Sequence, residues 1–204
     1  MPDHETTNHH HGHHHGGWTM DQLQNLMRPD REKLMPRRPV LEQLGIREGA
    51  TVADVGAGLG WLTFPLAEAV GRQGQVYAID PSRDAIRMIQ DRVQREGWSQ
   101  VTAIEAFAER TPLPDGAVER IVWHTMYHDV HDRVQALQEM HRILSPEGRW
   151  VIVDWEKSPM EVGPPLSVRM NPDEVASELE GAGFRVLSRW TAGPVTWGLT
   201  VAKA

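Results

Sequence analysis

The glycine-rich run over residues 52–60 constrains the fold of this chain more than any other segment. Its sequence, VADVGAGLG, begins with nearly continuous apolar residues and ends with Gly56, Gly58 and Gly60 at alternate positions. A short apolar run bounded by glycine is typical of a strand buried on both faces of a parallel sheet. Glycines allow the backbone to turn sharply and to pass close to a ligand, where a Cβ atom would collide. We therefore expect a strand, a ligand-binding loop and a helix that begins at Gly60 or Trp61.

Predicted strands and helices alternate through the rest of the chain. Strand character is found over residues 51–55, 75–80, 101–105, 117–123, 149–154, 184–190 and 195–202. Helical character is found over residues 61–70, 82–95, 132–144 and 172–182. This alternation predicts an α/β fold with a doubly wound, mostly parallel seven-stranded sheet. Because only a short turn separates the last two strands, we expect them to form a C-terminal antiparallel hairpin.

The N-terminal part of the chain differs in composition from the rest. Residues 1–17 include the tract HHHGHHHGG, which is polar and of low complexity, so we expect a disordered tail in the absence of a ligand. Neutral imidazoles bind Ni, Zn or Cu, so the tail has loose candidate metal ligands at His9, His10, His11, His13, His14 and His15. Residues 18–48 have the apolar positions of two short helices, which we expect Pro29, Pro36 and Pro39 to interrupt. The expected third unit, residues 49–204, is a ligand-binding domain.

Length and composition exclude several classes of protein. A chain of 204 residues is long enough for one α/β domain and too short for two comfortable ones. No stretch approaches the roughly 20 apolar residues of a membrane span, and no apolar signal core is present, so the cytoplasm is the expected location. The absence of cysteine excludes a thiol nucleophile. A formal charge of −7, without a long Lys/Arg block, argues against a nucleic-acid partner.

An acidic residue is predicted at the end of the second strand. Asp80 follows Gly60 by 20 residues, at the position where a carboxylate accepts hydrogen bonds from both ribose hydroxyls of a bound nucleotide. The dinucleotide fingerprint has its third glycine one position beyond Gly60, where this chain has Trp61. Asp80 alone does not distinguish one adenosine-containing cofactor from another.

The glycine spacing and two later segments resemble a known family. Gly56, Gly58 and Gly60 resemble motif I of the class I S-adenosylmethionine (SAM) methyltransferases. TPLPDGAVERIVW, residues 111–123, resembles the stretch of these enzymes that leads from the adenine loop into the fourth strand. HRILSPEG, residues 141–148, resembles the turn after their next helix, although Ser145 and Glu147 replace the usual lysine and glycine. The resemblance implies a Rossmann-like methyltransferase fold over most of the chain and SAM as the cofactor.

The resemblance also places the cofactor at the ends of the strands. It implies that Asp54 lies beneath the methionine amino group and that Asp80 holds the ribose. Phe107 stands where the family often has an aspartate that reads the adenine amino group, so we expect stacking and the Ala108 amide to hold adenine. The expected cofactor-binding residues are Asp54, Gly56, Ala57, Gly58, Asp80, Pro81, Ser82, Phe107, Ala108 and His124.

A polar cluster follows the predicted fourth strand. WHTMYHDVHD, residues 123–132, has histidines and a tyrosine at the carboxyl edge of the sheet, where ligands bind in such folds. Its histidines could supply a general base, a metal site or only structural hydrogen bonds. We take His128 and His124 as the candidate catalytic residues. Asp154, at the end of the predicted fifth strand, could pair with a histidine.

These observations favour a SAM-dependent methyltransferase that acts on a small-molecule acceptor. The segment after the fourth strand is WHTMYH and not the Asn-Pro-Pro-Tyr type that holds a flipped base, which disfavours nucleic-acid methylation. One alternative is an NAD-dependent oxidoreductase, which Trp61 and the terminal hairpin oppose. The other is a metal-binding or metal-handling protein that uses the histidine-rich tail.

Overall fold

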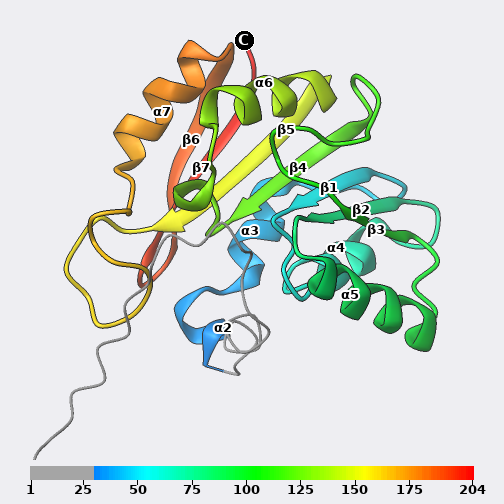
Figure 1. Cartoon of the computed structure of the whole chain (residues 1–204). Helices are drawn as coiled ribbons and strands as arrows, with labels where there is room; N and C mark the ends of the chain where they lie inside the picture. Colours follow the sequence, from blue (N-terminus) through cyan, green and yellow to red (C-terminus); the bar gives the residue numbers. More distant parts are fainter. Residues whose placement is uncertain (1–29) are drawn as a thin grey trace, which may run out of the picture.

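The computed structural model describes residues 30–204, which form a seven-stranded sheet (Figure 1). The strand order is β3-β2-β1-β4-β5-β7-β6, and β7 pairs antiparallel with both β5 and β6. The other pairings are parallel. The strands are β1 (Thr51–Val55), β2 (Gln75–Asp80), β3 (Val101–Glu105), β4 (Val118–His124), β5 (Leu144–Trp155), β6 (Phe184–Gly193) and β7 (Thr196–Lys203). The predicted fold class and the C-terminal hairpin are confirmed.

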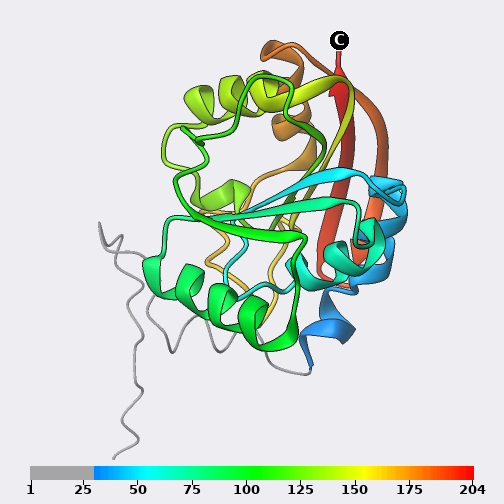
Figure 2. The same cartoon turned by 90° about the vertical axis from the view of Figure 1, so that its right-hand side faces the viewer.

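Helices cover both faces of the sheet. Buried residues of α3, α4 and α5 belong to one apolar cluster, and those of α6 and α7 belong to a second cluster. Figure 2 shows α5 and α6 on opposite sides of the strands. The helices are α2 (Arg31–Leu34), α3 (Arg37–Leu44), α4 (Thr63–Val70), α5 (Arg83–Glu96), the 3-10 turn η1 (Tyr127–Asp129), α6 (Arg133–Ile143) and α7 (Pro172–Gly181).

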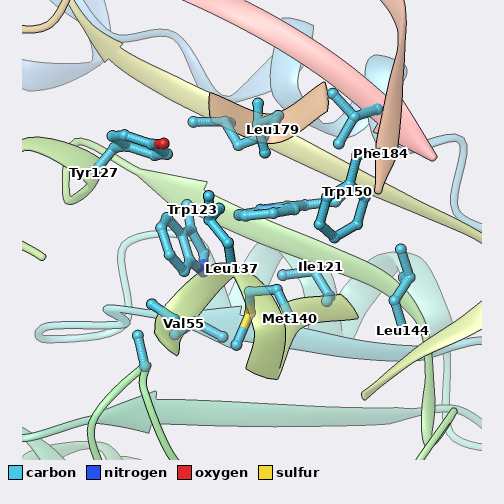
Figure 3. Packing of buried hydrophobic residues seen from close by; sticks show 14 of the residues in the cluster. Val55, Ile121, Trp123, Tyr127, Leu137, Met140, Leu144, Trp150, Leu179 and Phe184 are labelled. Atoms are coloured by element: carbon cyan, nitrogen blue, oxygen red, sulfur yellow. The ribbon is translucent and has the colours of Figure 1, made fainter. Parts of the chain in front are cut away.

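Large aromatic side chains fill the core between the sheet and α6 and α7 (Figure 3). The rings of Trp123 and Trp150 meet edge to face with centroids 4.8 Å apart, and Trp150 meets Phe184 in the same way at 5.2 Å. Tyr127 packs on Trp123 from the turn that follows β4. Edge-to-face pairs add about 0.5–1.5 kcal/mol each to the free energy gained by burial. This packing fixes the end of β4 and the start of the following loop.

The largest difference from the predicted element bounds lies at the junction of α6 and β5, and smaller ones include the start of α4. We expected a helix to Leu144 and a strand from Arg149, whereas α6 ends at Ile143 and β5 begins at Leu144. Leu144 pairs with Val118, and regular pairing resumes only where Arg149 meets Arg120, so the Ser-Pro-Glu-Gly segment forms an irregularity within β5. The predicted helix from Trp61 begins at Thr63, after a turn.

Pro39 does not interrupt a helix as the sequence predicted. It lies in the first turn of α3, where a backbone N–H would have no partner within the helix. Gly45 ends α3 in the left-handed conformation with a φ of 56°. The expected tail over residues 1–17 and the first of the two expected N-terminal helices lie outside the described residues.

Candidate active site

The candidate site lies at the carboxyl ends of the parallel strands. β1 occupies the centre of the sheet between β2 and β4, and the chain runs outward from it in both directions. In open α/β sheets, the crevice at this reversal of strand order is where ligands bind. The loops after β1 and β4 therefore flank the position where a ligand would lie, and β2, β3 and β5 contribute their own carboxyl ends.

The loop after β1 requires its glycines. Gly56, Gly58 and Gly60 all have positive φ angles, of 75°, 52° and 83°, which L side chains rarely adopt. A Cβ atom at Gly56 would lie 2.5 Å from the Met126 sulfur, and one at Gly60 would lie 2.7 Å from the Phe64 ring. The glycines thus allow the backbone to pass close to the loop after β4 and to α4. This agrees with the tight turn expected from the sequence.

Asp80 ties this loop to the end of β2. Its Oδ2 accepts a hydrogen bond from the Gly58 amide at 2.8 Å, and its Oδ1 accepts one from the Ser82 amide at 2.8 Å. Burial raises the pKa of Asp80, and the two hydrogen bonds offset only part of that rise. Each carboxylate oxygen has more than one lone-pair position, so the group can accept further bonds from a ligand. Pro81 is exposed beside it, and Ser82 caps α5 by accepting from the Ala85 amide at 3.3 Å.

Asp54 lies beneath the glycine loop and is almost fully buried. Its Oδ2 accepts a hydrogen bond from the Thr63 hydroxyl at 2.6 Å, at the start of α4. Burial raises the pKa of Asp54 to about 7; the Thr63 hydrogen bond opposes the rise, and the charge of Asp80 adds to it. A cationic group of a ligand placed against Asp54 would favour its ionised form.

Phe107 is the most exposed large apolar residue among those placed around the site. It follows β3 with 65% of its surface exposed, while Ala108 beside it is buried. Backbone pairing between Phe107 and Arg110 closes a tight turn there. An exposed ring held on a rigid turn, one strand away from Asp80, suits stacking on a flat heterocycle.

The two candidate histidines have different surroundings. His124, at the end of β4, is buried, and its Nδ1 lies 3.4 Å from the Arg31 guanidinium of α2. Burial, together with the charge of Arg31, lowers the pKa of His124 to about 3. The ring is therefore neutral at physiological pH and a weak base. Between His124 and His128, Thr125 has a positive φ of 56°, a conformation that costs of order 1–3 kcal/mol and concentrates at functional sites.

His128 forms a buried pair with Asp154 of β5. Its Nδ1 lies 2.8 Å from Oδ1 of Asp154, and its backbone N–H donates to Oδ2 at 3.2 Å. Only 4% of the His128 side chain and none of the Asp154 side chain is exposed. Burial alone would lower the pKa of His128, but the hydrogen bond and charge of Asp154 outweigh it and raise that pKa. A carboxylate at Nδ1 selects the tautomer in which Nε2 has the lone pair. This geometry favours His128 over His124 as a base.

The segment after β5 is packed rather than loosely attached. The Arg169 guanidinium is buried and donates to the carbonyl oxygens of Pro164, Ser158 and Val162 at 2.7–2.8 Å. A Cβ atom at Gly163 would lie 2.6 Å from the Trp155 ring, so the backbone of the segment rests on that indole. The segment therefore forms a fixed wall beside the His128–Asp154 pair.

Three residues near the site were not identified from the sequence. Thr63 holds Asp54, Arg169 organises the wall after β5, and Arg31 reaches His124 from outside the sheet. None belongs to a spaced motif. For Thr63, the only local signal was its position nine residues after Asp54. The partners of Arg31 and Arg169 are brought close only by tertiary folding.

The structure leaves the predicted metal site untested. His9 to His15 lie outside the described residues, and within residues 30–204 no group of three or more His, Asp or Glu side chains could hold a metal ion. Over the same residues, none of the helices combines the length and apolar character needed to cross a bilayer.

Comparison with known proteins gives a consistent family. Residues 52–148 match the model of the methyltransferase domain. The chain is 30% identical over 118 residues to the demethylmenaquinone methyltransferase of Anoxybacillus flavithermus and 31% identical over 127 residues to the ubiquinone/menaquinone biosynthesis C-methyltransferase UbiE of a Marinomonas species. These matches cover 58% and 62% of this chain, and the chain spans about half the length of either relative, 50% and 51%.

A solved structure matches nearly the whole domain. The crystal structure of a SAM-dependent methyltransferase from Aquifex aeolicus superposes with a TM-score of 0.85 and 30% sequence identity. The match covers 91% of this chain and 98% of the Aquifex chain. The similarity therefore includes the C-terminal hairpin as well as the glycine loop.

Proposed function

Because the chain belongs to the class I SAM-dependent methyltransferases, we propose that it transfers a methyl group from SAM to a small-molecule acceptor. The observation that carries this proposal is the hydrogen bond between the Gly58 amide and the Asp80 carboxylate. It joins the glycine loop to the acid expected at the ribose, at the reversal of strand order where this fold binds ligands. Neither the NAD alternative nor the metal-handling alternative is supported by the relatives.

The residues at the strand ends fit the cofactor. Asp80 would accept the ribose hydroxyls, Asp54 would face the ammonium group, and Phe107 would stack on adenine. Gly56 and Gly58 have no Cβ atoms that would collide with a cofactor lying against this loop. When bound, SAM supplies a methyl group on a positively charged sulfur, which makes the leaving group good without acid assistance. The protein's main task is therefore to align the acceptor and exclude water.

The His128–Asp154 pair points to an acceptor that must lose a proton. Asp154 would hold Nδ1–H of His128, so that Nε2 could take the proton from the acceptor and the nearby carboxylates could stabilise the resulting imidazolium. An amine or thiolate acceptor would need no such base. The names of the two relatives refer to demethylmenaquinone and to ubiquinone/menaquinone biosynthesis. A quinol or another hydroxyaromatic compound fits these names, and it has a hydroxyl proton that a base could remove.

A methyl-transfer assay tests this proposal. The protein is incubated with methyl-labelled SAM and a panel of reduced quinones, simple hydroxyaromatic compounds and amines, and products are identified by mass spectrometry. We expect label in at least one hydroxyaromatic acceptor and release of S-adenosylhomocysteine in equal amount. The O-methyl ether of the same acceptor is the matched control, since it has no hydroxyl proton to remove and should not react. Labelling of amines but of no hydroxyaromatic compound would contradict the proposed acceptor class.

A further inference from the structure

A single buried guanidinium organises the segment that follows β5. Figure 1 shows this segment, residues 156–171, as a broad loop between the end of β5 and the start of α7. Arg169 lies near its end, with only 3% of its surface exposed. Its Nε, Nη1 and Nη2 donate to the carbonyl oxygens of Pro164, Ser158 and Val162 at 2.7–2.8 Å. One side chain thus holds three points of the segment together.

Both ends of the segment are attached to the hairpin of β6 and β7. The Glu156 amide donates to the carbonyl oxygen of Val195 at 3.0 Å, and the Glu156 carbonyl oxygen lies 3.4 Å from Nη1 of Arg169. At the other end, the Trp197 indole N–H donates to the carbonyl oxygen of Met170 at 3.2 Å. The structure describes every residue of the segment, and none of them belongs to a helix or a strand. The segment therefore depends on Arg169 for its shape between the two attachments.

The hydrogen bonds of Arg169 do not neutralise its positive charge. A guanidinium stays protonated in proteins, and the acceptors given above are all neutral main-chain carbonyl groups. These carbonyls satisfy the N–H groups, but burying a charge without an ionic partner is costly. A role for the charge in the neighbouring site would explain why the chain keeps it there.

The charge of Arg169 acts on His128. Burial lowers the pKa of His128, and the carboxylates of Asp154 on β5 and Asp129 on η1 outweigh burial and raise it. The charge of Arg169 opposes the two carboxylates and lowers the pKa of His128. A general base works best when its pKa lies near the working pH, because a base that is already protonated cannot accept a proton. Arg169 therefore favours the form of His128 that can act as a base.

We propose that Arg169 is a positioning residue for methyl transfer, which holds the segment after β5 as the acceptor wall and keeps a positive charge within electrostatic range of the His128–Asp154 pair. This inference rests on the proposed function, in which His128 removes a proton from the acceptor. Loss of Arg169 would then loosen the wall and leave His128 protonated over a wider range of pH. Neither effect requires Arg169 to touch the acceptor or the cofactor.

Nuclear magnetic resonance titration of the histidine rings tests the electrostatic part without an acceptor. The full chain is titrated with S-adenosylhomocysteine present, and the His128 signal is identified by its absence from His128→Ala. Arg169→Met removes the charge but keeps a long side chain, so the titration midpoint of His128 should move to higher pH. Arg169→Lys keeps the charge and should leave the midpoint close to that of the unaltered chain. If Arg169→Met fails to fold, Arg169→Gln takes its place as the neutral variant.

Hydrogen exchange tests the wall. The amides of Val168 and Arg169 donate to the carbonyl oxygens of Pro165 and Leu166 at 3.1 and 3.3 Å, so their exchange reports whether the end of the segment stays folded. In Arg169→Met, amides of this segment should exchange at least about tenfold faster. Amides of β1, at the centre of the sheet, are the internal reference and should keep their rates.

Arg189 provides a matched control. It lies on β6, half-exposed, and pairs with Asp173 at the start of α7. Surface pairs of this kind contribute little to stability, so Arg189→Met should change neither the midpoint of His128 nor the exchange of the segment.

The pH dependence of the rate separates positioning from general stability. With an acceptor found by the methyl-transfer assay, Arg169→Met should lose at least about tenfold in kcat/KM at neutral pH and regain part of the loss as the pH rises and His128 loses its proton. An unchanged midpoint, unchanged exchange or a loss of rate that is the same at every pH overturns the role of Arg169 and leaves the proposed function standing. If the unaltered chain fails to bind S-adenosylhomocysteine, the proposed function itself is overturned.

Discussion

Replacing His128 by alanine is expected to lower the rate of methyl transfer by about 10²–10⁴-fold, the usual contribution of a general base. The reason is the pair with Asp154, which holds Nδ1 at 2.8 Å and so selects the tautomer whose Nε2 can accept a proton. Because the ring is assigned to the acceptor and not to the cofactor, affinity for S-adenosylhomocysteine should change by less than about twofold. Initial rates with a reactive acceptor, together with calorimetry, measure both quantities.

The pH profile separates a catalytic role for His128 from a structural one. A base works only when unprotonated, so the rate of the unaltered protein should fall as the pH drops through the pKa of His128, which Asp154 raises. His128→Ala should lose this acid limb, and Asp154→Asn should move it to lower pH. His141→Gln, a histidine change on α6 against Phe184, is the control and should keep the full rate. A loss of only about two- or threefold in His128→Ala would return His128 to a structural role.

Replacing Asp80 by alanine is expected to weaken S-adenosylhomocysteine by at least about tenfold, or about 1.4 kcal/mol. Two charge-assisted hydrogen bonds to the ribose, each worth roughly 1.5–3 kcal/mol when buried, would be lost. The change also removes the acceptor of the Gly58 and Ser82 amides, so the glycine loop and the start of α5 lose a shared anchor. Calorimetry measures the affinity, and thermal unfolding reports whether the fold persists.

Glu105 offers a control for Asp80. It is the register partner of Asp80 at the end of β3, but it is exposed and pairs with Arg83 at 3.1 Å. Surface ion pairs of this kind contribute at most about 1 kcal/mol, so Glu105→Ala should leave both the affinity and the fold unchanged. A folded Asp80→Ala protein with undiminished affinity would mean that the cofactor does not lie across the end of β2.

Local sequence pattern predicted the parts of the fold that local physics decides. The first three strands have the predicted bounds. Each is a short apolar run, and the glycines, charged residues or helix cap beside it leave little choice of where the strand begins and ends. Ser82 caps α5 as expected, since a serine side chain can satisfy the free amides of a helix start. The turn of the glycine loop can also be predicted from the local sequence, because glycine adopts its positive φ angles readily and other residues rarely do.

Long-range contacts decided the features that the sequence did not reveal. β5 begins early because Leu144 pairs with Val118, and nothing in the segment itself encodes that partner. The position of Asp154 on the fifth strand suggested a histidine partner, but only the folded loop after β4 identifies it as His128. Arg31 lies 93 residues before His124 in the chain, so no spacing rule could have joined them.

Calorimetric titration of the full chain with S-adenosylhomocysteine and, separately, with NAD tests the central claim most directly. Both ligands contain an adenosine whose ribose Asp80 could hold, but only S-adenosylhomocysteine has the amino-acid end that Asp54 would recognise. The glycine loop also has Trp61 where the dinucleotide fingerprint requires its third glycine. We expect S-adenosylhomocysteine to bind at least about a hundredfold more tightly than NAD, a difference of about 2.7 kcal/mol. Equal or tighter binding of NAD would contradict the assignment of the chain's cofactor.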